Sequence, residues 1–226
     1  PRSKYFNGSL DEIRLWNVVR TQAEIQENMC KKLTGTEPGL AGYWNFNEKS
    51  GTTIKDLTVN ANNGTLMNSD NDEHLFSGAS IGDASIFDYN SAGGFTATLS
   101  HPDGDAITAT TTSCTITGLQ IYRVEDNPLR TNSTTPPDVT LSQFRYWGVK
   151  AIGSNNPTYT VSYNYTGHPG ITEPNEILLD LALRDNLADD SWINMIANIN
   201  TTTNTLTLNG MTGTEYTLAT LSDDPL

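Results

Sequence analysis

The chain has 226 residues, a length that suits one large domain or two modest ones. Its formal net charge is −13 with only 13 Lys and Arg, which argues against binding to phosphate backbones. No run approaches the roughly 20 apolar residues of a membrane-spanning helix, and no signal peptide is visible. Because Pro1 is not an initiator Met, we expect a fragment or a processed product whose targeting segment lies upstream.

Composition favours an all-β protein. Hydrophobic residues make up 36% of the chain and charged residues only 17%, while Thr, Asn, Ser and Gly are abundant. Short apolar runs in such a background are typical of β-sandwiches with long polar loops. The 6 Phe, 9 Tyr and 4 Trp are enough to seed the cores.

The first segment predicts a strand followed by a helix. Apolar and polar residues alternate over Leu10–Trp16 apart from one step, which indicates a half-buried strand. Residues 20–33 predict a helix, because Thr21 and Glu24 have the spacing of a capping box. One face of this helix would carry Ile25, Met29 and Leu33.

Further short strands are predicted at Leu40–Phe46 and Thr65–Met67, on either side of the turn-rich segment Asn47–Gly64. We place the domain boundary near residue 79, where polar and small residues follow one another.

Nearly everything beyond residue 79 alternates with period two, which indicates an antiparallel sandwich. Pro128–Ser142 is predicted to be a long polar loop, and Asn209-Gly210 a turn. The predicted strands are Phe95–Leu99, Ile107–Thr111, Leu119–Val124, Phe144–Ala151, Tyr159–Tyr165, Ile177–Leu183, Trp192–Ile199, Thr205–Leu208 and Tyr216–Leu221.

Two places offer oxygen ligands of the kind that calcium prefers. The first combines Asp11 and Asp56 with Asn60 and Asn63, and an alternative is that Asp11 caps a turn and Asp56 forms an Asx-turn. The second is Asp103-Gly104-Asp105, which starts like a calcium loop. The Glu required at the twelfth position of such a loop is Cys114 here, so a hairpin turn is favoured at this second place.

The sequence offers little for catalysis, and we predict that the chain is not an enzyme. His101 and His168 each precede Pro, which fits turn residues, and no nucleophile elbow or paired metal-binding histidines are present. Cys30 and Cys114 are expected to be partly buried thiols, with a disulfide as the less favoured alternative.

Aromatic residues could stack on sugar rings where they are exposed. Adjacent aromatics in a strand point to opposite faces, so one member of each pair Tyr43-Trp44 and Tyr146-Trp147 could face outward. Core packing is the favoured fate of most of the eight candidates. They are Trp16, Tyr43, Trp44, Tyr146, Trp147, Tyr163, Tyr165 and Trp192.

Residues 1–78 resemble the C-terminal part of a laminin-G-like jelly roll of the concanavalin A-like lectin superfamily. The resemblance lies in the segments Phe6–Asn17, Thr21–Ile25, Gly39–Phe46, Gly51–Thr53 and Asn60–Leu66. It implies that earlier strands lie upstream or are supplied by another chain, and that a structural calcium ion is bound. Thr58-Val59-Asn60-Ala61 departs from the common Ser-Gly-Asn-Gly pattern of the family.

Residues 79–226 are similar to the region before the sorting domain in large secreted surface proteins of Bacteroidota. The similarity lies in the segments Gly82–Ser85, Leu99–Asp105, Ile121–Val124, Tyr159–Tyr165 and Asp223–Leu226. It implies an immunoglobulin-like β-sandwich, export by the type IX route and a C-terminal sorting domain after Leu226.

Together these patterns predict the non-catalytic C-terminal part of a secreted, cell-surface adhesin that binds glycan or protein. One alternative is an accessory module of a secreted polysaccharide- or protein-degrading enzyme. A second is export cargo captured with components of the type IX secretion machinery.

Overall fold

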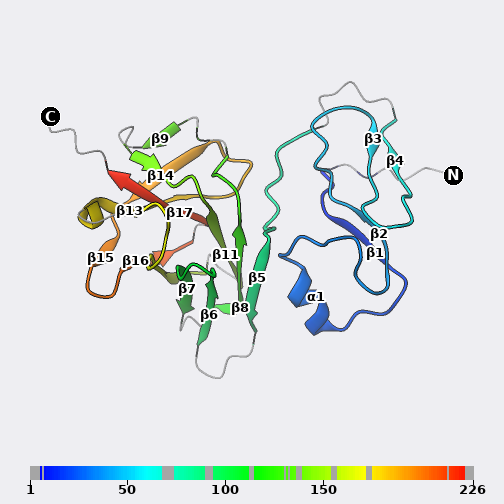
Figure 1. Cartoon of the computed structure of the whole chain (residues 1–226). Coiled ribbons are helices and arrows are strands. Elements are labelled where there is room, and N and C mark those ends of the chain that lie inside the picture. The colour runs from blue at the N-terminus through cyan, green and yellow to red at the C-terminus, as the bar shows by residue number, and fades with distance from the viewer. Residues whose placement is uncertain are drawn as a thin grey trace. The chain divides into compact units, whose positions relative to one another are not determined.

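The computed structural model describes two compact units formed by different parts of the chain (Figure 1). The first unit comprises Pro1–Glu24 and Leu33–Ala79, and the second comprises Ile25–Lys32 and Ser80–Leu226. The described residues are 6, 8–67, 74–89, 94–111, 115–129, 131, 133–135, 139–153, 157–171, 175–212 and 214–221. No helix among them is long and apolar enough to cross a membrane.

The first unit is built from two small antiparallel sheets. Strand β1 (Ile13–Trp16) pairs with β2 (Leu40–Trp44), and β3 (Thr53–Ile54) pairs with β4 (Gly64–Thr65). The strand that we expected from residue 10 begins at residue 13. Glu12 has a positive φ of 52°, which interrupts the extended backbone. The core cluster of this unit is small and comprises Leu33, Leu40, Tyr43 and the partly buried Trp16.

The predicted helix is shorter than expected. Helix α1 spans Gln22–Asn28, and its capping box is confirmed, since the Thr21 N–H donates to Glu24 Oε2 at 2.7 Å and the Glu24 N–H donates to Thr21 Oγ1 at 3.3 Å. The predicted apolar face is wrong, because Ile25 is 54% exposed and the chain leaves the helix before residue 33.

The short segment after helix α1 is held by hydrogen bonds to Gly82. The Gly82 N–H donates to the Cys30 carbonyl at 3.1 Å, and the Lys32 N–H donates to the Gly82 carbonyl at 2.8 Å. This pairing carries the Cys30 side chain into the second unit, where it is 1% exposed. The domains that we predicted, 1–78 and 79–226, stay predictions; the compact units differ from them chiefly in this segment.

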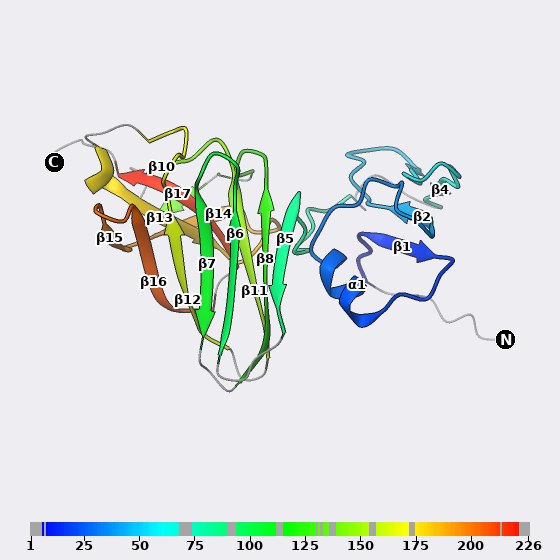
Figure 2. The ribbon, with the colours of Figure 1, turned by 60° about the horizontal axis from the view of Figure 1, so that its bottom comes forward.

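The second unit contains two sheets, which are antiparallel apart from one strand pair in the larger sheet (Figure 2). The larger sheet runs in the order β5 (Ala84–Asp88), β8 (Ile116–Val124), β11 (Tyr146–Gly153), β17 (Glu215–Leu221), β13 (Leu179–Arg184), β14 (Ser191–Met195) and β9 (Ser133–Thr135), and β10 (Val139–Leu141) also pairs with β17. Strand β9 is parallel to β14. The smaller sheet runs in the order β15 (Asn198–Asn200), β16 (Thr205–Met211), β12 (Tyr159–Asn164), β7 (Ala106–Thr111) and β6 (Phe95–Ser100).

One hydrophobic core joins the two sheets of the second unit, an arrangement consistent with a β-sandwich. The alternating apolar residues predicted from the sequence supply it from both sides. The smaller sheet contributes Phe95, Ala97, Ile107, Ala109, Tyr159, Val161, Tyr163, Leu206 and Leu208. The larger sheet contributes Ile116, Leu119, Ile121, Trp147, Val149, Leu179, Leu181, Tyr216 and Leu218.

The opposite face of the larger sheet is also buried. A second cluster there contains Tyr122, Val124, Val139, Leu141, Tyr146, Ala182, Trp192, Ala219 and Cys30. The expectation that one member of the pair Tyr146-Trp147 faces outward is therefore wrong. The two side chains do point to opposite faces, but both faces are covered, and the residues are 4% and 2% exposed.

Several details of the second unit differ from the sequence prediction. The predicted strand Trp192–Ile199 is wrong as one strand, because it is divided into β14 and β15, which belong to different sheets, and β5 was not predicted. Part of the predicted loop Pro128–Ser142 forms β9 and β10, and Val139 and Leu141 in β10 are buried. The predicted Asn209-Gly210 turn lies inside β16, at a register shift against β12, where Gly210 has a φ of +69°. The residues predicted to begin a strand at Ile177 instead start with the short 3₁₀ helix η1 (Asn175–Leu178).

Candidate functional site

The β6–β7 hairpin carries a cluster of ionisable side chains. The His101 N–H donates to the Asp105 carbonyl at 2.8 Å, and the Gly104 N–H donates to the His101 carbonyl at 3.0 Å. Gly104 has a φ of +120°, a conformation that L-residues rarely adopt. The hairpin turn that the sequence favoured for Asp103-Gly104-Asp105 is thereby confirmed.

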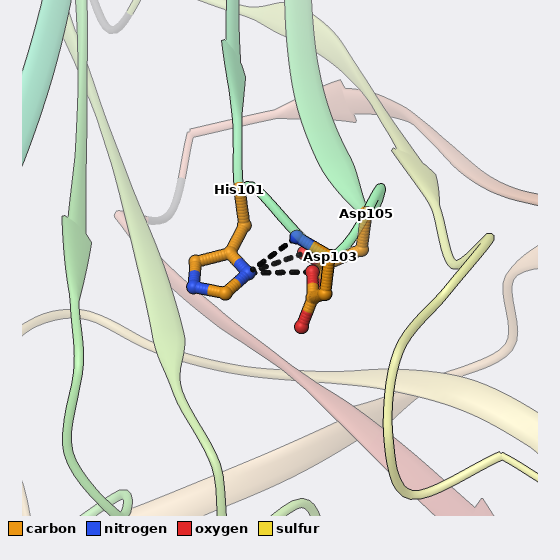
Figure 3. Close-up of side chains that lie close together, drawn as sticks. All are labelled: His101, Asp103 and Asp105. Carbon is orange, nitrogen blue, oxygen red and sulfur yellow. Dashed lines mark hydrogen bonds and ion pairs between the residues drawn. The ribbon is translucent and has the colours of Figure 1, made fainter.

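Three side chains of this hairpin can together hold a metal ion. The ligand atoms of His101, Asp103 and Asp105 all lie within 4.8 Å of one another (Figure 3). Nδ1 of His101 lies 2.5 Å from Oδ1 of Asp103 and 3.9 Å from Oδ1 of Asp105. A nitrogen combined with carboxylate oxygens is a donor set typical of zinc and related ions, whereas calcium takes oxygen ligands. The sequence prediction missed His101 as a member of this group.

Arg145 already pairs with both carboxylates. Its Nη1 donates to Asp105 Oδ1 at 2.6 Å and to Asp103 Oδ1 at 3.0 Å, and its Nη2 donates to Asp103 Oδ2 at 2.7 Å. The Tyr163 hydroxyl donates to Asp105 Oδ2 at 2.5 Å. All four carboxylate oxygens therefore have a donor, and a metal ion bound by both carboxylates would compete with the guanidinium.

The two carboxyl groups differ in their environment and in their pKa. Asp105 is fully buried, and burial raises its pKa to about 6 despite the nearby Tyr163 hydroxyl and Arg145. Burial also acts on Asp103, but hydrogen bonds from Arg145 and His101 outweigh it and hold the pKa of Asp103 well below its usual range. Asp103 is therefore the carboxylate that stays ionised as the pH falls.

Glu125 and Arg123 extend the ion pairs to strand β8. Oε1 of Glu125 accepts a hydrogen bond from Arg123 and lies 3.5 Å from Nε2 of His101, while Oε2 lies 3.6 Å from Nε of Arg145. Arg123 also donates to the Ser100 carbonyl and lies over the Trp147 ring, 5.5 Å from its centroid. The charged cluster thus fastens the hairpin end of the smaller sheet to strands of the larger sheet.

His168 lies beside this cluster and is held neutral. Its Nδ1 accepts a hydrogen bond from the Gly170 N–H at 3.1 Å, so its Nε2 carries the proton and donates to Ser142 Oγ at 3.1 Å. Burial and the positive charge of Arg145 lower the pKa of His168 to about 4. Every hydrogen-bonding atom of this imidazole is occupied in the fold.

A second buried ion pair lies on the other face of the larger sheet. Arg184 Nε donates to Glu215 Oε2 at 2.6 Å, and the Tyr122 hydroxyl donates to Glu215 Oε1 at 2.9 Å. The Arg184 guanidinium lies 4.3 Å from the centroid of the Trp192 ring. Burial raises the pKa of Glu215 even though Arg184 opposes the shift. This pair belongs to the packing of the second cluster.

Asp56, predicted as a calcium ligand, binds backbone amides in the structure. Its Oδ1 accepts from the N–H groups of Tyr43 at 3.0 Å and Thr58 at 2.9 Å, and its Oδ2 accepts from the N–H of Asn62 at 2.9 Å. Burial by itself would raise its pKa, but these hydrogen bonds prevail and lower it. The bond to Thr58, two residues on, is the Asx-turn given as the alternative.

Two of the other predicted calcium ligands, Asn60 and Asn63, also have hydrogen-bond partners. Asn63 Oδ1 accepts from the Asp56 N–H at 3.0 Å, and Asn60 Nδ2 donates to the Ala41 carbonyl at 2.9 Å. Asp11 is half-buried. Among the described His, Cys, Asp and Glu residues, the group of three or more with converging ligand atoms is the one at His101. Calcium binding at Asp11, Asp56, Asn60 and Asn63 stays a prediction.

Most of the aromatic candidates for sugar binding are in the cores. Tyr43, Tyr146, Trp147, Tyr163, Tyr165 and Trp192 are at most 4% exposed. Trp16 and Trp44 are partly exposed in the first unit, and the indole Nε1 of Trp44 donates to the Asn62 carbonyl at 3.0 Å. Cys30 is buried, and Cys114 lies outside the described residues.

Comparisons with protein-family models, with curated proteins and with solved structures found no match for this chain.

Proposed function

We propose that the chain is a non-catalytic part of a large secreted, cell-surface adhesin, exported by the type IX route, that contacts glycan or protein partners. The proposed folds are a partial laminin-G-like jelly roll in the first unit and an immunoglobulin-like sandwich in the second. The observation that carries the proposal is the pairing of the charged cluster. Arg145 and Tyr163 bind all four oxygens of Asp103 and Asp105, so these groups act as internal fasteners.

Such a cluster suits a part with a mechanical role. It connects the β6–β7 hairpin with Arg145, next to β11, and with Tyr163 on β12, so opening the sandwich at this end would separate buried charges. Loops on a stiff sandwich can vary without disturbing the core, and they are the usual place for partner contacts.

A structural metal ion is part of this proposal. The resemblance in the first unit implies calcium at Asp11, Asp56, Asn60 and Asn63. The ligand atoms at His101, Asp103 and Asp105 suit a zinc-like ion, which would have to displace Arg145 from the two carboxylates. Titration of the purified chain with CaCl₂ and separately with ZnCl₂, followed by calorimetry and thermal unfolding, distinguishes the two sites. The variant Asp56→Asn should weaken calcium binding and leave zinc binding unchanged, and His101→Gln should weaken zinc binding and leave calcium binding unchanged.

The adhesive role is tested with beads that carry the purified chain. We expect these beads to be retained on glycan- or protein-coated surfaces under flow and beads carrying albumin to be washed away. The same preparation is assayed for release of reducing sugar and of peptide from mixed polysaccharide and protein substrates. Retention without hydrolysis supports the proposal, and hydrolysis by the chain itself would contradict it. Loss of retention on every surface would also contradict it.

A further inference from the structure

The outward face of the smaller sheet carries small, uncharged side chains that are polar at every position but Ala106, and we call it the threonine face. Inward residues of the same strands fill the core, so the alternate positions point away from it. These positions are Thr96, Thr98, Ser100, Ala106, Thr108, Thr110, Thr160, Ser162, Asn164, Asn198, Asn200, Thr205, Thr207 and Asn209. None of them is charged, although the chain as a whole has 39 formally charged residues, 13 basic and 26 acidic.

Strand register arranges these side chains in rows across the sheet, whose strand order can be followed in Figure 2. One row is Thr98, Thr108, Ser162 and Thr207, and a second is Thr96, Thr110 and Thr160. Neighbouring side chains within a row are about 4.8 Å apart, and successive rows are about 6.8 Å apart along the strands. The face is therefore a repeating array, which matches a ligand with a repeat better than a single small molecule.

Hydrogen bonds between neighbours hold the array in place. The Thr98 and Thr108 hydroxyls lie 2.9 Å apart, and the Thr160 hydroxyl donates to Asn209 Oδ1 at 2.9 Å. Threonine is also stiff about χ1 because it is β-branched. Little side-chain freedom remains to be lost when a partner binds, so weak contacts repeated over several rows can add up.

The chemistry of the threonine face selects among classes of partner. Hydroxyl and amide groups both donate and accept hydrogen bonds, as sugar hydroxyls do. Protein interfaces are anchored by aromatic residues and Arg, and nucleic-acid sites by Lys and Arg, and the face has none of these. The net charge of −13 would repel acidic polymers. An uncharged polysaccharide fits all of these conditions.

We infer that the threonine face binds an uncharged polysaccharide chain, which runs along the strands and exchanges hydrogen bonds with successive rows of hydroxyl groups. This inference rests on the proposed adhesive function and gives it a ligand class and a surface.

The test is affinity electrophoresis of the full chain in native gels containing dextran, galactomannan or hydroxyethyl cellulose, with alginate as the acidic comparison. We expect retardation by at least one neutral polymer and none by alginate. Thr98→Val with Thr108→Val removes two hydroxyl groups and keeps their shape, and Thr98→Lys with Thr108→Lys obstructs the face. Each pair should weaken retardation at least tenfold. Thr140→Lys, at an exposed threonine of β10 in the larger sheet, is the matched control and should leave it unchanged.

Each outcome bears on the inference separately from the proposed function. Thermal unfolding of every variant shows that a loss of binding is not a loss of fold. Retardation that both double variants retain would place glycan binding on another surface, overturning the inference while supporting adhesion. The inference would also be overturned if no neutral polymer retarded the chain, or if alginate alone did. The bead assay would then test the adhesive role independently.

Discussion

The two units differ in how their folds are held together. Among the described residues, the first unit has four buried hydrophobic side chains against ten large exposed ones, and the second has 29 against ten. The exposed set of the first unit is Phe6, Leu10, Leu15, Val18, Val19, Leu57, Val59, Met67, Leu75 and Phe76. Burial organises the second unit, whereas local polar contacts such as the turn at Asp56 organise the first.

This difference has a consequence for stability. Two-stranded sheets are marginal by themselves in water, and a core of a few side chains stabilises them little. The first unit is therefore expected to open more readily than the second. Substitutions that discriminate between the units test this comparison.

The largest effect is expected from Arg145→Met in the second unit. The substitution leaves Asp103 and Asp105 close together without their cation, and loss of one partner of a buried ion pair typically costs about 3–5 kcal/mol. The measurement is urea unfolding followed by tryptophan fluorescence. Arg145→Lys, which keeps the charge without the planar fork, should cost less. A loss below about 1 kcal/mol for Arg145→Met would mean that the cluster does not stabilise the sandwich.

A smaller and more local effect is expected from Asp56→Ala in the first unit. Three backbone N–H groups lose their acceptor, and unsatisfied buried donors cost about 1–3 kcal/mol each, so we expect a loss of about 3 kcal/mol after partial hydration. Amide hydrogen exchange should accelerate in the first unit only. Asp56→Asn retains one carbonyl oxygen and should lose less. Equal acceleration in both units would show that they do not differ in the way proposed.

The pH dependence of the second unit should change in His168→Asn. The pKa of His168 is about 4 in the fold and about 6.5 in the unfolded chain, so the unfolded state takes up a proton first as the pH falls. Stability from this group is complete above pH 6.5 and is lost toward pH 4, by about 2 kcal/mol at pH 5.

The His168→Asn variant should lack that loss of stability, which is measured by urea unfolding at pH 8 and pH 5.

Asp105→Asn tests a pH dependence of stability with the opposite sign. Its pKa is raised to about 6, so Asp105 stabilises the fold as the pH drops through that value, and the variant should lose this gain. Identical pH profiles for wild type and His168→Asn would contradict the assignment of a neutral, buried imidazole.

The smallest effect, about 1 kcal/mol, is expected from Cys30→Ser, which places a hydroxyl in an apolar cluster. In sequence, Cys30 lies between two stretches of the first unit, but its side chain packs in the second. The substitution should therefore destabilise the second unit and not the first. Hydrogen exchange of β8 and β11 should report the change. Met29→Ser, at a partly exposed neighbour, should stay within about 0.5 kcal/mol of wild type. Faster exchange in the first unit alone would refute this placement of residue 30.

Sequence patterns predicted strands better than they predicted connections. Alternation located β6, β7, β8, β12 and β17 closely, because side-chain period fixes which residues face a core. It missed β9 and β10, since three-residue strands in a segment rich in Thr and Pro look like part of a loop. It also missed the covering of Tyr146, because alternation cannot reveal that both faces of a sheet are buried.

The candidate site was only partly visible in the sequence. The acidic hairpin at Asp103 and Asp105 could be located, but Arg145 lies 40 residues beyond Asp105 and Tyr163 lies 58 beyond it. No local spacing connects residues so far apart, and only the pairing of strands brings them together. Asp56 shows the reverse case. Its role depends on neighbours within a few residues, and the Asx-turn alternative already described its bond to Thr58.

The placement of Ile25–Lys32 in the second unit makes the gene order and the spatial order of this protein interleave. Residues 33–79 belong to the first unit, and the chain re-enters the second unit at Ser80. During synthesis Cys30 emerges before Gly82, its hydrogen-bonding partner. The hydrogen bond between them can therefore form only after residues 33–79 have also been synthesised. Neither unit is encoded by one uninterrupted stretch of the chain. Recombination at a single point near residue 79 would therefore separate the second unit from Ile25–Lys32, which packs in it.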